Sequence, residues 1–136
     1  MWEEYLSPDS VQEALEILLS HKGEARIIAG GTDLVIDLRK GSKKARCLVD
    51  IGKIEDLKKI NYDGDEIVIG SCVTHSQVVS SRVIQDKATV LAEAAATIGS
   101  PQIRNIGTVV GNVVNAQPAA DAAVALFALN ARAEIV

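Results

Sequence analysis

The chain has 136 residues, a length typical of one compact domain. Apolar residues make up 48% and charged residues 24%, which excludes a disordered or collagen-like polymer. The formal net charge of −4 leaves no excess of cations to neutralise phosphates, so nucleic acid is not an expected partner.

Three features of the chain indicate a cytoplasmic protein that does not span a membrane. The two cysteines, Cys47 and Cys72, form no CxxC pair and offer no thiolate set for zinc or an iron–sulfur cluster. Residues 1–5 (MWEEY) are acidic where a signal peptide would be basic. The longest weakly polar stretch, 122–129, is far shorter than the roughly 20 residues that a bilayer requires. We therefore expect a reducing compartment and no metal site.

Helix and strand signals alternate in the first half of the chain. Ser10 and Glu13 form a capping-box pattern before an apolar helical stripe, so we expect a helix from residue 11 that ends near Gly23. The next elements are predicted to be a strand at 26–29, a helical turn at 34–38, a basic loop at 39–46 and a strand at 47–51. Two strands joined by a crossover predict a small parallel sheet.

The second half is rich in alanine and poor in charge. The elements predicted there are a short helix at 54–59, an Asp63-Gly64 hairpin with a strand at 66–69, helices at 74–79 and 88–97, a strand or tight loop at 106–115, a helix at 118–129 and a strand from 132 to 136. Only five charged residues follow Lys87. A segment so poor in charge is either a small-residue core or a face that a ligand, partner chain or further sequence covers.

Two segments that contain glycine are candidate anion-binding loops. Gly30, Gly31 and Thr32 follow an apolar strand, and their backbone N–H groups can approach an anion without obstruction by Cβ atoms. The segment 107–112 (GTVVGN) also carries hydroxyl and amide groups. Neither segment has the Gly-Lys-Ser/Thr ending or the GxGxxG pattern, which disfavours a kinase or an ordinary nicotinamide-binding fold. Taken singly, the two segments are also typical of a turn and of a strand with a bulge.

The remaining candidates are weaker. His21 and His75 have no evident nucleophile or metal partner, so we expect them at the surface. Cys47 and Cys72 lie in apolar, strand-like contexts typical of buried thiols. The basic residues of 39–46 are expected in a solvated loop, with docking to an acidic partner as the alternative.

Several short segments match one family in order and spacing. They are 27–34 (IIAGGTDL), 48–51 (LVDI), 98–108 (IGSPQIRNIGT), 111–112 (GN) and 118–121 (PAAD). Through these segments the chain resembles the FAD-binding medium subunit of the molybdenum hydroxylases, the family of xanthine dehydrogenase and carbon monoxide dehydrogenase. The likeness covers nearly the whole chain, and AGGTD together with QIRNxGT carries its specificity.

The resemblance implies an α/β (α+β) FAD-binding fold of two subdomains, with a small parallel sheet followed by a mixed or antiparallel sheet with helices. Residues 1–60 would form the first subdomain and 61–136 an incomplete second one. It also implies an oxidoreductase component for electron transfer. The 2Fe–2S clusters of an iron–sulfur subunit would receive electrons from a molybdopterin subunit and pass them to FAD. FAD would then pass them to NAD or another acceptor. The chemistry would belong to the flavin, so no catalytic residue is assigned.

The resemblance also assigns residues to the cofactor, with the pyrophosphate on the two glycine segments and other positions along the groove. These residues are Ile27, Ile28, Ala29, Gly30, Gly31, Thr32, Asp33, Leu34, Ile98, Gly99, Thr108, Val109, Val110, Gly111, Asn112, Asn115, Ala120 and Asp121. Arg104 and Asn105 are expected to shape their loop.

Two departures from the family pattern stand out. The family usually has Thr-x-Gly-Gly-Asn, whereas Val110 takes the place of the first glycine here, and a β-branched side chain resists positive φ. We therefore expect either an extended backbone at Val110 or weaker binding of the pyrophosphate. The chain is also much shorter than family members, and we expect one of three explanations: an excised fragment, a split subunit completed by another chain, or a degenerate relative.

Two other functions compete with the FAD-binding subunit. The first is an assembly piece that keeps the fold without flavin. The other, which ranks below both the FAD-binding subunit and the assembly piece, is a flavin oxidase of the vanillyl-alcohol type. Such oxidases commonly attach the flavin through histidine or cysteine, and neither residue lies near the glycine segments in the sequence.

Overall fold

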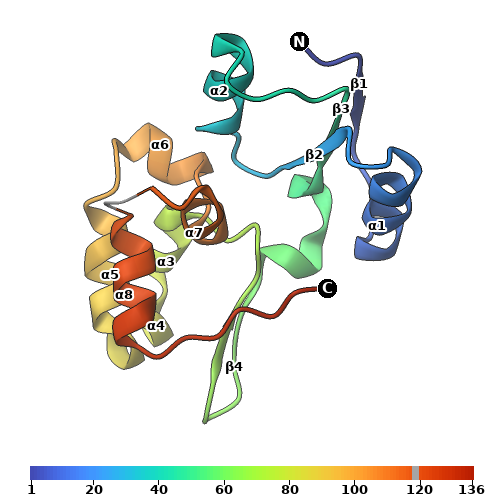
Figure 1. Cartoon of the computed structure of the whole chain (residues 1–136). Helices are drawn as coiled ribbons and strands as arrows, with labels where there is room; N and C mark the ends of the chain where they lie inside the picture. The colour runs from blue at the N-terminus through green and yellow to red at the C-terminus, as the bar shows by residue number, and fades with distance from the viewer. Residues whose placement is uncertain (118–119) are drawn as a thin grey trace.

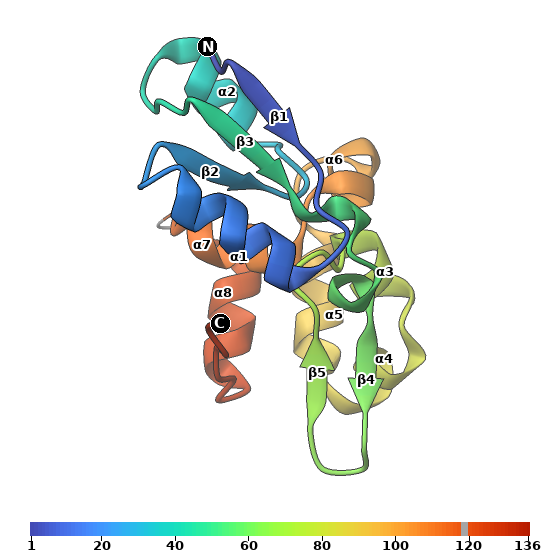
Figure 2. The same ribbon diagram turned by 90° about the vertical axis from the view of Figure 1, so that its right-hand side faces the viewer.

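The first part of the chain forms a three-stranded parallel sheet with a helix on each face. A computed structural model describes residues 1–117 and 120–136. The elements of this part are β1 (Glu4–Leu6), α1 (Val11–Ser20), β2 (Ala25–Ile28), α2 (Leu34–Lys40), β3 (Cys47–Asp50) and two 3-10 helices, η1 (Ile51–Lys53) and η2 (Glu55–Lys58). The strand order is β1-β3-β2, with both outer strands parallel to β3. Figure 2 shows β3 between its two neighbours.

The side chains of β3 alternate between two apolar clusters. Cys47 and Val49 pack with Ala14 of α1, whereas Leu48 packs with Leu38 of α2. Successive residues of a strand point to opposite faces, so α1 and α2 cover opposite sides of the sheet. This burial on both faces explains why the sequence of β3 is a continuous apolar run.

The second part begins with a hairpin and continues with helices. Its elements are β4 (Ile60–Tyr62), β5 (Ile67–Ile69), α3 (His75–Ser80), α4 (Arg82–Lys87), α5 (Thr89–Ala96), α6 (Pro101–Ile106), α7 (Val109–Asn115) and α8 (Asp121–Ala128). The hairpin is antiparallel, and α5 and α8 run side by side below α6 (Figure 1). The core here is built from buried side chains of α3, α4, α5 and α8, together with Val73 and Val109.

Local signals in the sequence fix several helix starts. The Ser10 hydroxyl accepts a hydrogen bond from Glu13 N, as the capping pattern predicts, but the Glu13 carboxylate accepts from Asp9 N. Thr74 and Gln77 form a complete capping box at the start of α3. Each bond satisfies a backbone donor that the first helical turn leaves free.

The structure corrects some predicted elements. Residues 106–115 form no strand: α6 ends at Ile106 and α7 begins at Val109. Residues 132–136 form no strand either, and Arg132 at the start of this tail pairs with Glu66 of the hairpin. The last helix begins at Asp121, and the predicted positions Pro118 and Ala119 lie outside the described residues.

Four of the described elements were not predicted: β1, η1, α4 and α6. None of the described helices is long and apolar enough to cross a membrane.

Candidate functional site

The two glycine segments, far apart in the sequence, meet in the structure. A Cβ atom at Gly30 would lie 2.1 Å from the backbone oxygen of Ile106 and 3.0 Å from Cα of Gly107. Because a real Cβ atom cannot approach a backbone oxygen so closely, only glycine at position 30 allows this contact. The loop between β2 and α2 therefore lies against the junction of α6 and α7 (Figure 1).

The first segment turns sharply into α2. Gly31 has a positive φ of 70°, which favours glycine, and its carbonyl accepts a hydrogen bond from Val35 N at 3.2 Å. The side chain of Ile28 is buried in the cluster beside β3, so only its backbone can face a ligand. Ile27 and Asp33 are exposed.

The second segment is a helix start, because Thr108 caps α7. Its Oγ1 accepts from Gly111 N at 3.0 Å, while Val109 N donates to the Val73 carbonyl at 3.1 Å. Val110 lies in the first turn with a helical backbone, so of the two outcomes expected for it the extended backbone is excluded, and weaker binding of the pyrophosphate stays a prediction. A β-branched residue fits a helical φ, so Val110 causes no backbone strain. The Val109 side chain belongs to the second core.

A cleft of about 270 Å³ lies where the segments meet. Its lining residues are Ala29, Gly30, Gly52, Lys58, Cys72, Thr74, Gln77, Ile106 and Thr108. Among them Lys58 is the only charged one, and its Nζ lies 2.7 Å from Glu55 Oε1. Sites for whole organic ligands usually measure about 300–1,000 Å³, so this cleft matches a part of a dinucleotide. A cationic group, hydroxyls and glycine backbone suit a phosphate.

Asn112 on α7 carries a buried acceptor without a partner. No hydrogen-bond donor reaches its Oδ1 among the described residues. Buried polar atoms are normally paired, and an unpaired one indicates a missing donor. A flavin dinucleotide offers N–H and O–H donors on its ring, ribityl chain and adenine. The residues present therefore fit FAD at two points, the phosphate cleft and this acceptor.

A second group of predicted residues gathers beside α8. Thr97 Oγ1 donates to Asp121 Oδ2 at 3.3 Å, which brings Ile98 and Gly99 near the start of α8. Arg104 fixes this loop, because its guanidinium donates to the carbonyls of Ile98 at 3.0 Å and Gly99 at 3.4 Å. The shaping role expected for Arg104 agrees with these bonds.

The predicted residues thus fall into separate places. Ala29, Gly30 and Thr108 line the cleft, whereas Thr32 does not. Asn112 and Asn115 belong to α7, which contacts α8. The lining residues that sequence reasoning missed are Gly52, Lys58, Cys72, Thr74, Gln77 and Ile106.

His75 is buried, so the surface position predicted for it is wrong. It is 3% exposed, and its Nδ1 has no hydrogen-bond partner among the described residues. Its ring lies near Gly107, and His75 N donates to the Gly107 carbonyl at 3.0 Å. Burial, together with the nearby Arg104 charge, lowers the pKa of His75 below 6.5.

This burial predicts a specific acid sensitivity. Just below pH 6.5 the His75 ring is protonated in the unfolded chain but stays neutral in the folded chain. Unfolding therefore takes up a proton. The free energy of unfolding should therefore fall as the pH drops below 6.5, and this contribution should be flat above it. Urea unfolding across this range should show a weaker pH dependence in His75→Gln. An unchanged dependence in the variant would rule His75 out as the cause.

The fold and the cleft between the two glycine segments fit a flavin-binding domain. Residues 2–136 match the family described as FAD binding domain in molybdopterin dehydrogenase, and the chain belongs to that family. The family, the α/β fold and the FAD cofactor expected from the sequence are confirmed.

Curated relatives and a solved structure agree with this assignment. The chain is 39% identical over 128 residues to the 6-hydroxypseudooxynicotine dehydrogenase complex subunit alpha of Paenarthrobacter nicotinovorans, covering 94% of this chain and 43% of the relative. It is 36% identical to the nicotinate dehydrogenase FAD-subunit of Eubacterium barkeri, covering 94% and 44%.

Carbon monoxide dehydrogenase from Hydrogenophaga pseudoflava, in a form lacking the Mo-pyranopterin moiety, superposes with a TM-score of 0.84 at 34% identity. This match covers 87% of the present chain and 41% of that one. The chain therefore spans less than half the length of the relatives it matches.

Proposed function

We propose that this chain holds FAD in a molybdenum hydroxylase, with the pyrophosphate at the cleft between the two glycine segments. The contact of Gly30 with the backbone at Ile106 carries the proposal, because it brings two distant segments to one place. When bound, FAD would receive electrons from the iron–sulfur clusters of one partner subunit and pass them to NAD or another acceptor. Those clusters would receive the electrons from a molybdopterin subunit. The names of the relatives as dehydrogenase subunits support this role.

The chain's own residues would bind and orient the cofactor. Backbone N–H groups of the first segment and the Thr108 hydroxyl would face the pyrophosphate, and Lys58 would add a positive charge. Asn112 Oδ1 would accept from a donor of the cofactor. The groove would continue along Ile98, Gly99, Asn115, Ala120 and Asp121. Residues 1–60 and 61–136 would act as its two halves, in a cytoplasmic protein.

Flavin absorption tests the proposal. The protein is purified with the subunits that accompany it, desalted and measured for the flavin spectrum and the ratio of FAD to chain. We expect about one FAD per chain to survive desalting. Protein without flavin, which also fails to take up added FAD, would favour the flavin-free assembly piece.

Lys58 offers a sharper test of where the pyrophosphate lies. Lys58→Met should weaken FAD binding about tenfold at low salt, since a cation beside a phosphate contributes a charge-assisted contact of about 1.5–3 kcal/mol. Lys59→Met is the matched control, because Lys59 pairs with Asp56 and does not line the cleft. Fluorescence titration of flavin with both variants gives the affinities. Equal affinities in the two variants would place the pyrophosphate elsewhere.

A further inference from the structure

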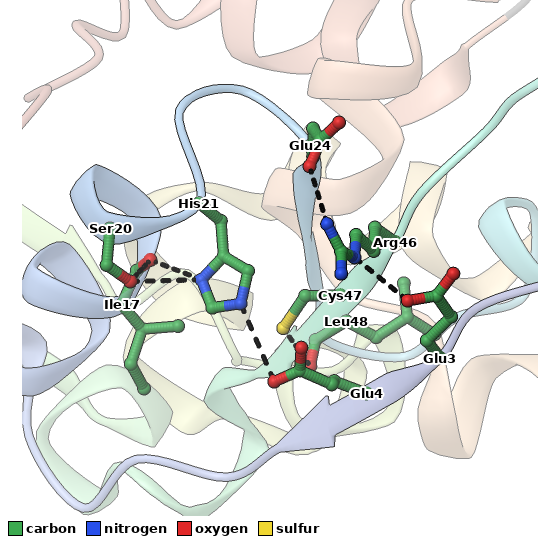
Figure 3. Close-up of polar contacts among 9 residues, drawn as sticks. All are labelled: Glu3, Glu4, Ile17, Ser20, His21, Glu24, Arg46, Cys47 and Leu48. Carbon is green, nitrogen blue, oxygen red and sulfur yellow. Dashed lines mark hydrogen bonds and ion pairs between the residues drawn. The ribbon is translucent and has the colours of Figure 1, made fainter.

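Three side chains from different elements converge beside the parallel sheet, away from the FAD cleft. They are Glu4 of β1, His21 at the end of α1 and Cys47 of β3 (Figure 3). One carboxylate oxygen, one ring nitrogen and the sulfur all lie within 4.8 Å of one another. Nitrogen, sulfur and carboxylate oxygen are the ligand types that Zn²⁺ takes in proteins.

The histidine ring is held with one nitrogen facing the cluster. Its Nδ1 lies 2.8 Å from the Ile17 carbonyl oxygen. A carbonyl can only accept, so Nδ1 carries the hydrogen, and the lone pair of the neutral ring is on Nε2. Nε2 faces Glu4 (Figure 3). Metal-binding histidines are commonly oriented in this way, through a backbone carbonyl on the other nitrogen.

The distance between His21 and Glu4 suits two ligands of one metal ion better than a direct hydrogen bond. His21 Nε2 lies 3.6 Å from Glu4 Oε2, which is too long for a hydrogen bond. Two ligands of a tetrahedral Zn²⁺, each about 2.0–2.1 Å from the metal, are about 3.4 Å apart. The Glu4 side chain is 48% exposed, so it can make the remaining adjustment.

The charges around the cluster leave Glu4 available. Arg46, on which the Glu4 charge also acts, is engaged by Glu3 at 2.8 Å and by Glu24 at 3.6 Å. Among the described residues no lysine or arginine lies within ion-pair distance of Glu4, and its only partner is His21. A cavity of about 450 Å³ opens beside the cluster and is lined by Glu4, Ser20, His21, Lys22, Glu24 and Arg46. Water from this cavity can reach an ion held there.

Cys47 supplies the sulfur from the buried side. Its Sγ has one weak contact, 3.7 Å from the Leu48 carbonyl. Burial, together with the Glu4 charge, raises the pKa of this thiol, so the free protein holds it protonated. When a metal binds, the sulfur–metal bond replaces the S–H bond and the proton leaves to the solvent.

We propose that Glu4, His21 and Cys47 form a site for one Zn²⁺-type divalent ion, with water from the adjoining cavity as the fourth ligand. The ion would join β1, α1 and β3 at the side of the sheet. Ca²⁺ and Mg²⁺ prefer oxygen ligands and are not expected there. The proposal is independent of FAD, because none of the three residues lines the flavin cleft.

Cobalt and zinc titrations test the site in the purified native protein. Added Co²⁺ should give a thiolate-to-cobalt absorption band at one ion per chain, and added Zn²⁺ should abolish it by competition. Cys47→Ala should remove the band. Glu4→Gln and His21→Gln should weaken Zn²⁺ binding at least tenfold, and Glu4→Gln changes an exposed side chain that the fold does not need.

Cys72→Ala is the matched control for metal binding, since Cys72 is also buried but does not belong to the cluster of three ligands, and its Sγ donates to the Ile51 carbonyl at 3.4 Å. Because Cys72 lines the FAD cleft, this variant is compared for metal binding alone. It should keep the band and the affinity. The proposal is overturned if wild-type protein gives no band, if the band survives Cys47→Ala, or if Glu4→Gln and His21→Gln bind Zn²⁺ as tightly as wild type.

Discussion

Gly30→Ala is expected to lower the free energy of unfolding by about 3 kcal/mol and to abolish retention of FAD. The new Cβ would lie 2.1 Å from the Ile106 carbonyl oxygen, and both sides of the contact are backbone. Neither side can yield by a rotamer change, so the two segments must move apart. The cleft that they form would then open. Urea unfolding measures the stability, and the flavin-to-protein absorbance ratio after desalting measures the binding.

Gly64→Ala is the control for this substitution. Gly64 lies in the hairpin turn with φ 104° and open space around it. Its replacement should cost about 1 kcal/mol from backbone strain alone and leave FAD binding unchanged. If Gly30→Ala retains stability and flavin as well as Gly64→Ala does, the close packing of the two segments is not required.

Leu48→Ala is expected to cost about 3 kcal/mol, because it leaves a cavity in the first core. Leu48 is 0% exposed at the centre of the sheet and packs with Ile28, Leu38 and Ala45. Since Ile28 ends the strand before the first glycine segment, loosening this core should also weaken FAD binding. Urea unfolding measures the loss of stability directly.

Leu19→Ala provides a matched control with the same change of side chain. Leu19 is 78% exposed on α1, and alanine favours a helix, so stability should change by less than about 0.5 kcal/mol. Similar losses for both variants would contradict the burial that the structure assigns to Leu48.

The predictable elements are those whose signals are local. Helix α1 follows from a cap and an apolar period, the hairpin from an Asp-Gly turn, and the parallel pairing of β2 with β3 from two apolar runs joined by a crossover. The third strand of that sheet, β1, was not predicted. The helix at Val109–Asn115 differs from the strand or tight loop predicted there, because valines and glycines favour strands or turns by propensity. Its cap, Thr108 bonded to Gly111 N, and the packing of Val109 in the core override that propensity.

The residues that line the cleft could be predicted only in part, because some belong to a sequence pattern and the others are brought there by the fold. The glycine segments stand out through their family pattern. The path of the chain after β3 brings Lys58, Thr74 and Gln77 to the cleft. No pattern in the sequence around these residues indicates that they line it.

The same reasoning explains why the sequence alone did not indicate the proposed metal site. Residues 4, 21 and 47 have none of the close spacings that mark a metal motif, and only the parallel sheet brings them together. His75 was placed at the surface because a lone histidine carries no signal of burial.

Hydrogen–deuterium exchange of the native protein with and without FAD tests the central claim, that the two glycine segments form one cofactor site. FAD should slow exchange in peptides covering 29–34 and 106–112 at the same cofactor concentration. Slower exchange in only one of these peptides, with FAD bound, would contradict the account.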